Sequence, residues 1–341
     1  MNTATHSGPV ADSRLESLRL WLQQVVTEPV LDLQPASVDA SFRRYFRAQL
    51  PGRTAIVMDA PPDKEDCAQF IKVADLLHAA GLHAPEIQAR DLSQGFLLLS
   101  DLGTRTYLDV LNNDNAAPLF RDASDALIRW QLASRPDVLP PYDETLLRRE
   151  IDLFPDWYVR EHLKLTLTSK QQAVLTEAFA LIIRQNLSQP RVYVHRDYMP
   201  RNLMVSDPNP GIIDFQDAVY GPITYDAISL FKDAFISWPE EQVLDWVIRY
   251  WEKAKKAGLP VHADFGEYYR DLDWMGLQRH LKVLGIFARI HYRDGKPHYL
   301  TDTPRFLNYV RQTAIRYSTL TPLLRLLDEL ENRAASINQT L

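Results

Sequence analysis

The sequence predicts an α+β protein with two lobes, a small strand-rich N-terminal lobe and a larger helical C-terminal lobe. Three observations support this fold class. Five short strand-like segments lie between residues 31 and 99, and Pro51-Gly52 forms a hairpin turn between two of them. From Ser100 onward, apolar residues recur mainly at helical spacing. Two short apolar strands, at residues 192–194 and 203–205, interrupt the helical half and flank a polar loop.

The order of elements follows from the same periodicities. A first helix is expected to run to about Thr27, with Ser13 as its cap, and three strand-like segments follow it. A second helix ends at Gly81, and two more strands reach Leu99. We therefore predict a flexible tail over residues 1–12, an ATP-binding N-lobe over 13–100 and a helical C-lobe over 101–341. Helices are expected around 119–130, 174–182, 240–257, 267–291, 304–318 and 320–336.

Composition narrows the class of protein. The chain has 341 residues, 46% of them hydrophobic, and a formal net charge of −6. No basic run stands out, so we expect neither nucleic acid nor a membrane surface as a partner. Cys67 is the only cysteine, which excludes an intramolecular disulfide and fits a reducing compartment. The N-terminus lacks the pattern of a signal peptide, so we expect a cytoplasmic protein. The sequence carries no direct signal of the oligomeric state, for which a monomer is our default expectation.

The polar loop carries the most specific motif in the chain. His195-Arg-Asp197 is followed by Asn202 five residues after the aspartate, and Asp214 comes directly after a second apolar pair. One carboxylate can accept a hydroxyl proton, while an amide and a second carboxylate can hold magnesium on ATP phosphates. The spacing thus points to phosphoryl transfer from ATP with Mg²⁺.

From Asp197 to Asp214 the chain resembles the aminoglycoside phosphotransferase and choline kinase family, relatives of the protein kinases. The resemblance implies a protein-kinase-like two-lobed fold with ATP and Mg²⁺ between the lobes. It implies that Asp197 is the catalytic base and that Asn202 and Asp214 are magnesium ligands, while His195 supports the loop. Arg201 lies one residue before Asn202, where a guanidinium could stabilise charge on the transferring phosphoryl group; a surface salt bridge is the alternative.

The N-lobe departs from the family's usual ATP site. The turn at Ser37 to Ser41 has no glycine, but its small residues could still let backbone N–H groups approach phosphates. Met58 stands where relatives usually carry a phosphate-binding lysine. Arg43 or Arg44 on the preceding strand is a candidate replacement, and an exposed strand face is the alternative for both. Residues at the predicted hinge resemble the family's adenine-binding segment, namely Ser100, Asp101 and Leu102.

The substrate side is expected to combine charged and aromatic residues, which suits a sugar. Glu144, Arg148 and Glu150 belong to one such charged segment, and Asp217 follows the second carboxylate by three residues. Arg289 lies in a basic cluster after a long apolar helix and could receive a carboxylate-bearing substrate. The alternative for both clusters is a solvated helix with ion pairs.

A wider set of segments, including residues 41–47, 57–62 and 147–154, resembles bacterial anomeric kinases of cell-wall sugar recycling. That resemblance implies phosphorylation of the C1 hydroxyl of N-acetylmuramate and N-acetylglucosamine, and it would account for Met58. Three alternatives remain open here. They are an aminoglycoside- or choline-type phosphotransferase, a protein kinase, and a nucleotide-binding scaffold without activity.

Overall fold

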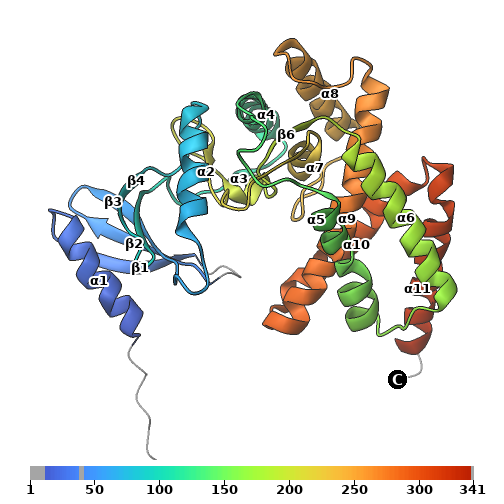
Figure 1. Cartoon of the computed structure of the whole chain (residues 1–341), viewed down its shortest axis with the longest axis horizontal. Coiled ribbons are helices and arrows are strands. Elements are labelled where there is room, and N and C mark those ends of the chain that lie inside the picture. The colour runs from blue at the N-terminus through green and yellow to red at the C-terminus, as the bar shows by residue number, and fades with distance from the viewer. Residues whose placement is uncertain (1–11, 38–41, 339–341) are drawn as a thin grey trace, which may run out of the picture. The chain divides into compact units, whose positions relative to one another are not determined.

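The computed structural model describes residues 12–37 and 42–338 of the chain. Residues 1–11 of the predicted tail, and Ser41 of the predicted phosphate-binding turn, lie outside these ranges. The chain forms two compact units (Figure 1). The first comprises residues up to Lys72 together with Pro85–Leu102, and the second comprises Val73–Ala84 together with Gly103–Leu341. Helix α2 (Cys67–Ala79) begins in the first unit and ends in the second.

The first unit is built on a five-stranded antiparallel sheet with the strand order β1-β2-β3-β5-β4. Phe46, Ala48 and Leu50 alternate with more exposed residues along β2, because successive side chains of a strand point to opposite faces. Gly52 turns the chain from β2 into β3 with a φ of +77°, which a glycine adopts without strain. The strands are β1 (Asp32–Ser37), β2 (Arg44–Leu50), β3 (Arg53–Asp59), β4 (Ile87–Asp91) and β5 (Phe96–Ser100).

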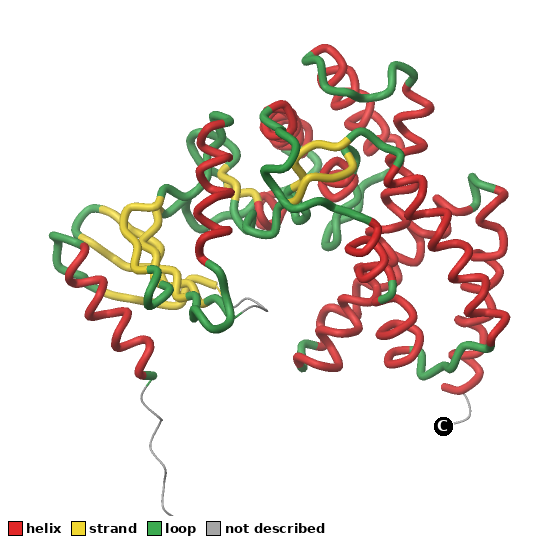
Figure 2. Tube along the Cα trace, in the orientation of Figure 1, coloured by secondary structure: helices red, strands yellow, loops and turns green. Residues whose placement is uncertain are grey.

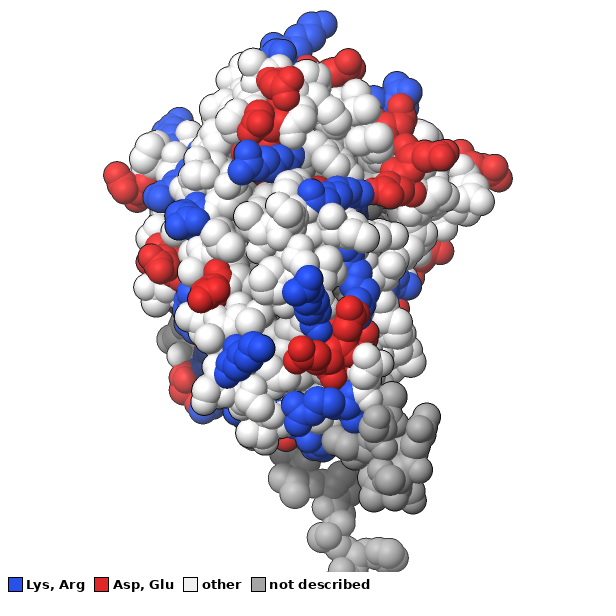
Figure 3. All heavy atoms as spheres, turned by 90° about the vertical axis from the view of Figure 1, so that its right-hand side faces the viewer, with Lys and Arg blue, Asp and Glu red and all other residues white. Residues whose placement is uncertain are grey.

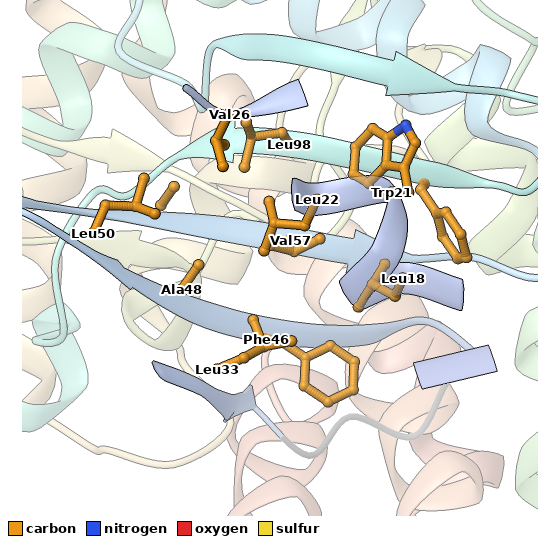
Figure 4. Close-up of a cluster of buried hydrophobic side chains, with 12 residues drawn as sticks. Leu18, Trp21, Leu22, Val26, Leu33, Phe46, Ala48, Leu50, Val57 and Leu98 are labelled. Carbon is orange, nitrogen blue, oxygen red and sulfur yellow. The ribbon is translucent and has the colours of Figure 1, made fainter. Parts of the chain in front are cut away.

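Helix α1 (Ser13–Val25) covers one face of this sheet. Its Leu18, Trp21 and Leu22 side chains point toward buried residues of the strands, such as Phe46 and Val57 (Figure 4). The predicted cap is wrong by one residue: the Asp12 carboxylate, not Ser13, accepts the Leu15 backbone N–H at 3.1 Å. A carboxylate suits this place because it also complements the positive end of the helix dipole.

The second unit is mainly helical (Figure 2), with short strand pairs in its N-terminal half. Strand β6 (Arg191–Val194) pairs with β9 (Val219–Pro222), and β7 (Leu203–Met204) pairs with β8 (Gly211–Ile212). The helices and helical turns are α3 (Tyr107–Val110), α4 (Ala116–Leu132), α5 (Glu144–Ile151), η1 (Phe154–His162), α6 (Ser169–Leu187), η2 (Pro200–Asn202), α7 (Tyr225–Phe231), α8 (Glu240–Lys256), α9 (Phe265–Asp294), η3 (Pro297–Asp302), α10 (Thr303–Ala314), η4 (Ser318–Leu320) and α11 (Thr321–Asn338).

The 30-residue helix α9 is the longest element of the second unit and packs against η1, α10, α7, α6 and α5. Gly285 lets α9 lie close to the start of η1, since a Cβ atom there would come within 2.3 Å of the Leu153 backbone. Ideal side-chain contacts are longer than 3.4 Å, so no larger residue fits without displacing the helix.

Charged residues of both signs are interspersed over the face drawn in Figure 3. Elsewhere in the described residues, oppositely charged side chains pair along one helix, as Arg249 and Asp245 of α8 do at 2.7 Å. Exposed pairs of this kind contribute little to stability because water and salt screen them. Across the described ranges, no helix combines the length and the apolar character that crossing a membrane requires.

Candidate active site

Three residues predicted from the motif meet in the second unit. Strand β6 leads into the loop with Asp197, and the short β7–β8 pair brings Asn202 close to Asp214. The Asn202 Nδ2 atom donates to an Asp214 carboxylate oxygen at 3.2 Å and to the Asp197 carbonyl oxygen at 2.9 Å. The Ile213 N–H donates to the Asn202 carbonyl at 3.1 Å. The loop and the second carboxylate are therefore held together as one local unit.

Asp226 holds the backbone at the start of this loop. It lies in α7, and its carboxylate accepts the His195 N–H at 2.7 Å and the Arg196 N–H at 3.0 Å. Complete burial raises the pKa of Asp226 to about 7, although the two N–H donors favour the charged form. The structure thus gives Asp226 the bracing role that a buried acceptor of two adjacent backbone donors can play.

His195 is also buried, and its Nδ1 atom accepts the Asp197 N–H at 3.3 Å. Burial lowers the pKa of His195 to about 4, so the imidazole is neutral at pH 7. A neutral ring that accepts from the loop backbone supports the loop and carries no charge toward a substrate.

The donor set fits a magnesium ion bound to nucleotide phosphates. The Asn202 amide nitrogen donates to the Asp197 carbonyl and to the Asp214 carboxylate, which leaves its Oδ1 atom for a cation. The Asp214 carboxylate accepts from Gln216 at 2.9 Å as well as from Asn202. Within residues 12–37 and 42–338, no group of three His, Cys, Asp or Glu side chains forms a metal site. Magnesium commonly takes only one or two protein oxygens and keeps phosphate and water ligands, so an amide and a carboxylate suffice.

Arg201, predicted to stabilise the transferring phosphoryl group, is half-buried at the end of the loop. Its guanidinium carbon lies 5.0 Å from the centroid of the Phe235 ring. Such a cation–π contact fixes the direction of the side chain. The role of Arg201 in phosphoryl transfer stays a prediction.

The residues predicted to bind ATP lie in the first unit, and several are engaged in contacts there. Arg44 donates to Asp59 at 2.9 Å and also forms an ion pair with Asp12. Met58 is fully buried in β3. The Ser100 hydroxyl accepts the Glu86 N–H at 2.8 Å, Asp101 accepts from Arg47 at 2.6 Å, and Leu102 ends the unit. Ser37 belongs to β1, and its side chain is outside the description.

The predicted substrate residues do not form one cluster. Glu144 and Arg148 line an open hollow on α5, with a volume of about 510 Å³, together with Asp152. Glu150 lies in the same helix but is buried. Asp217 is exposed, and its carbonyl oxygen accepts from Arg196 at 3.3 Å. Arg289 is half-buried in the C-terminal half of α9.

Sequence reasoning missed the role of Lys282. This α9 lysine is 7% exposed, and it donates to Glu150 at 3.0 Å and to the Tyr225 hydroxyl at 2.9 Å. Glu150 also forms an ion pair with Arg196 of the loop. The signal was present in the sequence, since a lysine within the apolar run around Leu281 and Val283 indicates a buried ion pair.

Comparisons with known proteins find similar sequences over most of the chain. Residues 32–265 match the phosphotransferase enzyme family. N-acetylmuramate/N-acetylglucosamine kinase of Pseudomonas putida is 52% identical over 333 residues, which are 95% of this chain and 98% of that one. The protein of the same name in Neisseria meningitidis is 49% identical, over 92% of this chain and 95% of that one.

Solved structures match most of the chain at low sequence identity. Choline kinase LicA from Streptococcus pneumoniae has a TM-score of 0.63 at 14% identity, and covers 87% of this chain and 99% of its own. The ADP-bound aminoglycoside phosphotransferase APH(2'')-Ib has a TM-score of 0.59 at 14% identity, over 88% of this chain and 98% of its own. These likenesses confirm the predicted α+β, protein-kinase-like fold class.

Proposed function

This chain belongs to the phosphotransferase enzyme family, and on that premise we propose that it is an ATP- and magnesium-dependent sugar kinase of the cytoplasm. The proposed acceptor is the anomeric C1 hydroxyl of N-acetylmuramate or N-acetylglucosamine, and the product would supply salvage of cell-wall sugars toward a UDP-activated sugar. The observation that carries the proposal is the junction of Asp197, Asn202 and Asp214, together with kinases of these sugars at about half identity.

In the proposed reaction, the Asp197 carboxylate accepts the proton of the sugar hydroxyl. The hydroxyl oxygen forms a bond to the γ-phosphorus, the bond from that phosphorus to the β–γ bridging oxygen breaks, and ADP leaves. A positioned general base contributes about 10²–10⁴ in rate. Asn202 and Asp214 would hold magnesium, which when bound neutralises charge on the phosphate oxygens. Arg201 would add a cation near the same oxygens.

For the nucleotide, we propose that the backbone of residues 100–102 holds adenine. Strand β5 ends there, and the Ser100 N–H and hydroxyl are already used by Glu86. Arg44 is held by Asp59, so a phosphate would have to compete with a buried carboxylate for it. A phosphate-binding role for Arg44 therefore receives no support from its contacts.

For the acceptor, we propose that Arg289 binds the carboxylate of an acidic sugar. Its Nε atom is buried and has no hydrogen-bond partner among the described residues. Burial, and after it the neighbouring Arg293, lower the pKa of Arg289, and the nearby Asp294 opposes this shift without cancelling it. Arg289 follows Lys282 by seven residues on α9, so both lie on one helix face, about 10 Å apart along the axis.

The proposal is tested by ATP consumption with a panel of amino sugars, aminoglycosides and choline. Phosphorus NMR of the product then locates the phosphate. We expect turnover of N-acetylmuramate and N-acetylglucosamine, with phosphate at C1 and none without magnesium. Turnover of no sugar, or phosphate at C6, would contradict the proposed function.

A further inference from the structure

The residue directly before Asp197 has an unusual backbone conformation. Arg196 has a φ of +77°, in the left-handed region that favours glycine. For a residue with a side chain this conformation is strained, and it persists only where the surroundings impose it. Asp226 supplies part of that constraint through the His195 and Arg196 N–H groups. Glycine would satisfy the same backbone bonds without strain, so the arginine side chain needs its own explanation.

The Arg196 side chain runs away from solvent and is 19% exposed. Its Nη2 atom forms an ion pair with Glu150 of α5, and its Nη1 atom donates to the Asp217 carbonyl at 3.3 Å. The guanidinium carbon lies 5.9 Å from the centroid of the Tyr142 ring. The guanidinium thus joins the loop to α5 and to the segment after Asp214.

Glu150 is a strong anchor because both of its oxygens are used. One accepts from Arg196 and from Lys282 of α9, and the other accepts from the buried Tyr142 hydroxyl. Burial alone would raise the pKa of Glu150, but Lys282 and Arg196 outweigh it and hold that pKa below its ordinary value. The Glu150 carboxylate therefore stays ionised and forms ion pairs with two cations.

A second set of contacts connects Lys282 to the loop. Lys282 also donates to the Tyr225 hydroxyl at 2.9 Å. Tyr225 immediately precedes Asp226, whose carboxylate holds the loop backbone. The loop is thus held through the Arg196 side chain by Glu150 and through its backbone by Asp226. Lys282 contacts Glu150 directly and also Tyr225, the residue next to Asp226.

We propose that Arg196 is a positioning residue that fixes Asp197, with the buried Glu150–Lys282 pair as its anchor. The inference rests on the proposed function, in which Asp197 accepts the sugar proton. It gives Glu150 a role in the loop's support, where the sequence predicted a substrate contact. The residues proposed to contact the sugar are not part of this network. Disrupting the network should therefore lower turnover more than it weakens sugar binding.

The test is Arg196→Gly, which relieves the backbone strain and leaves the Glu150–Lys282 pair intact. We expect a folded protein whose kcat falls about 10- to 100-fold, because an error of about 1 Å in a reacting group can cost that much. The KM values for sugar and ATP should change less than about threefold, since only positioning is lost. A kcat within about twofold of wild type would overturn the proposal.

Lys164→Gly is the matched control, because Lys164 is another left-handed cationic residue, with a φ of +55°, and its exposed side chain pairs with Glu161. It should leave kcat unchanged. Glu150→Gln and the double variant Glu150→Gln/Arg196→Gly complete a cycle. We expect the double variant to lose no more than the larger single loss, since both changes break one unit. Losses that multiply would contradict the anchor. If the wild-type protein phosphorylates no sugar, that result refutes the proposed function. The role of Arg196 is refuted only by variants of an active wild-type enzyme.

Discussion

Each unit of the molecule contains a buried carboxylate between two cations. In the first unit, Asp59 accepts from Arg14 at 3.1 Å and from Arg44 at 2.9 Å, and both arginine side chains are about a third exposed. In the second, Glu150 opposes Arg196 and Lys282, whose side chains are 19% and 9% exposed. The chemistry is similar, but the surroundings of the two carboxylates differ.

The elements that meet at each carboxylate explain the difference. Asp59 joins α1, β2 and β3, which are parts of one sheet and its covering helix. Glu150 joins α5 and α9 to the loop that carries Asp197. A buried ion pair can therefore stabilise a fold in one place and position a reacting group in another. We predict that substitutions of Glu150 or Arg196 in the second unit reduce turnover, while substitutions of Asp59 in the first unit reduce stability.

The largest effect is expected at Asp197. Asp197→Asn should fold and bind ATP normally, yet lose about 10²–10⁴ in kcat, because an amide cannot accept the hydroxyl proton. Steady-state kinetics and calorimetric ATP titration measure the two quantities. Asp207→Asn is the matched control, since Asp207 is an exposed carboxylate between Asn202 and Asp214. A near-normal kcat in Asp197→Asn would remove the general base from the proposed mechanism.

The next effect concerns the metal. Asp214→Ala should raise the magnesium concentration needed for nucleotide binding by at least about tenfold, because it removes one of two proposed oxygen ligands and an acceptor of Asn202. ATP titrations at a series of magnesium concentrations provide the measurement, and Asp207→Ala serves as control. An unchanged magnesium dependence would argue against Asp214 as a ligand.

A smaller and more selective effect is expected at Arg289. Arg289→Gln should raise KM for N-acetylmuramate about tenfold and leave KM for N-acetylglucosamine unchanged, since only the first sugar carries a carboxylate. Comparing kcat/KM for the two sugars measures this selectivity. The control is Arg293→Gln, which alters an exposed arginine paired with Asp294. Equal losses for both sugars would refute the carboxylate contact.

The smallest effect on turnover is expected in the first unit. Asp59→Asn should lower the free energy of unfolding by about 2 kcal/mol, because it weakens charge-assisted bonds to Arg14 and Arg44. Urea unfolding gives this value, and Asp32→Asn, at an exposed carboxylate of β1, is the control. A lower kcat at unchanged stability would instead place Asp59 in the catalytic machinery and blur the contrast between the units.

The sequence predicted features that depend on neighbours along the chain. The strands, most helices and the junction of Asn202 with Asp214 follow from short spacings, since two-residue strands leave the loop little freedom. The exception at the first helix is also local, because Asp12 and Ser13 both suit a cap and only the geometry selects one.

Features that depend on register or on distant packing could not be predicted in this way. The role of Arg44 near phosphates stays a prediction, but β2 and β3 pair so that Arg44 lies directly opposite Asp59, a contact that no local pattern indicates. Glu150 and Lys282 are separated by 132 positions in sequence, and no local pattern relates them. Their ion pair results from the packing of α5 on α9, whereas the sequence predicts a helix over 267–291 and only a charged segment around Glu144 to Glu150.

The close packing at Gly285 constrains the position of the whole of α9. It lies on α9 between Lys282, which meets Glu150, and Arg289, the proposed carboxylate contact. Because α9 is a rigid helix, it fixes the separation of these two residues along its axis, whichever substrate binds. A methyl group added at Gly285 would come within 2.3 Å of the Leu153 backbone. To relieve this clash, α9 would have to move relative to the loop that carries Asp197. The position of the proposed carboxylate contact and the support of the loop would then change together.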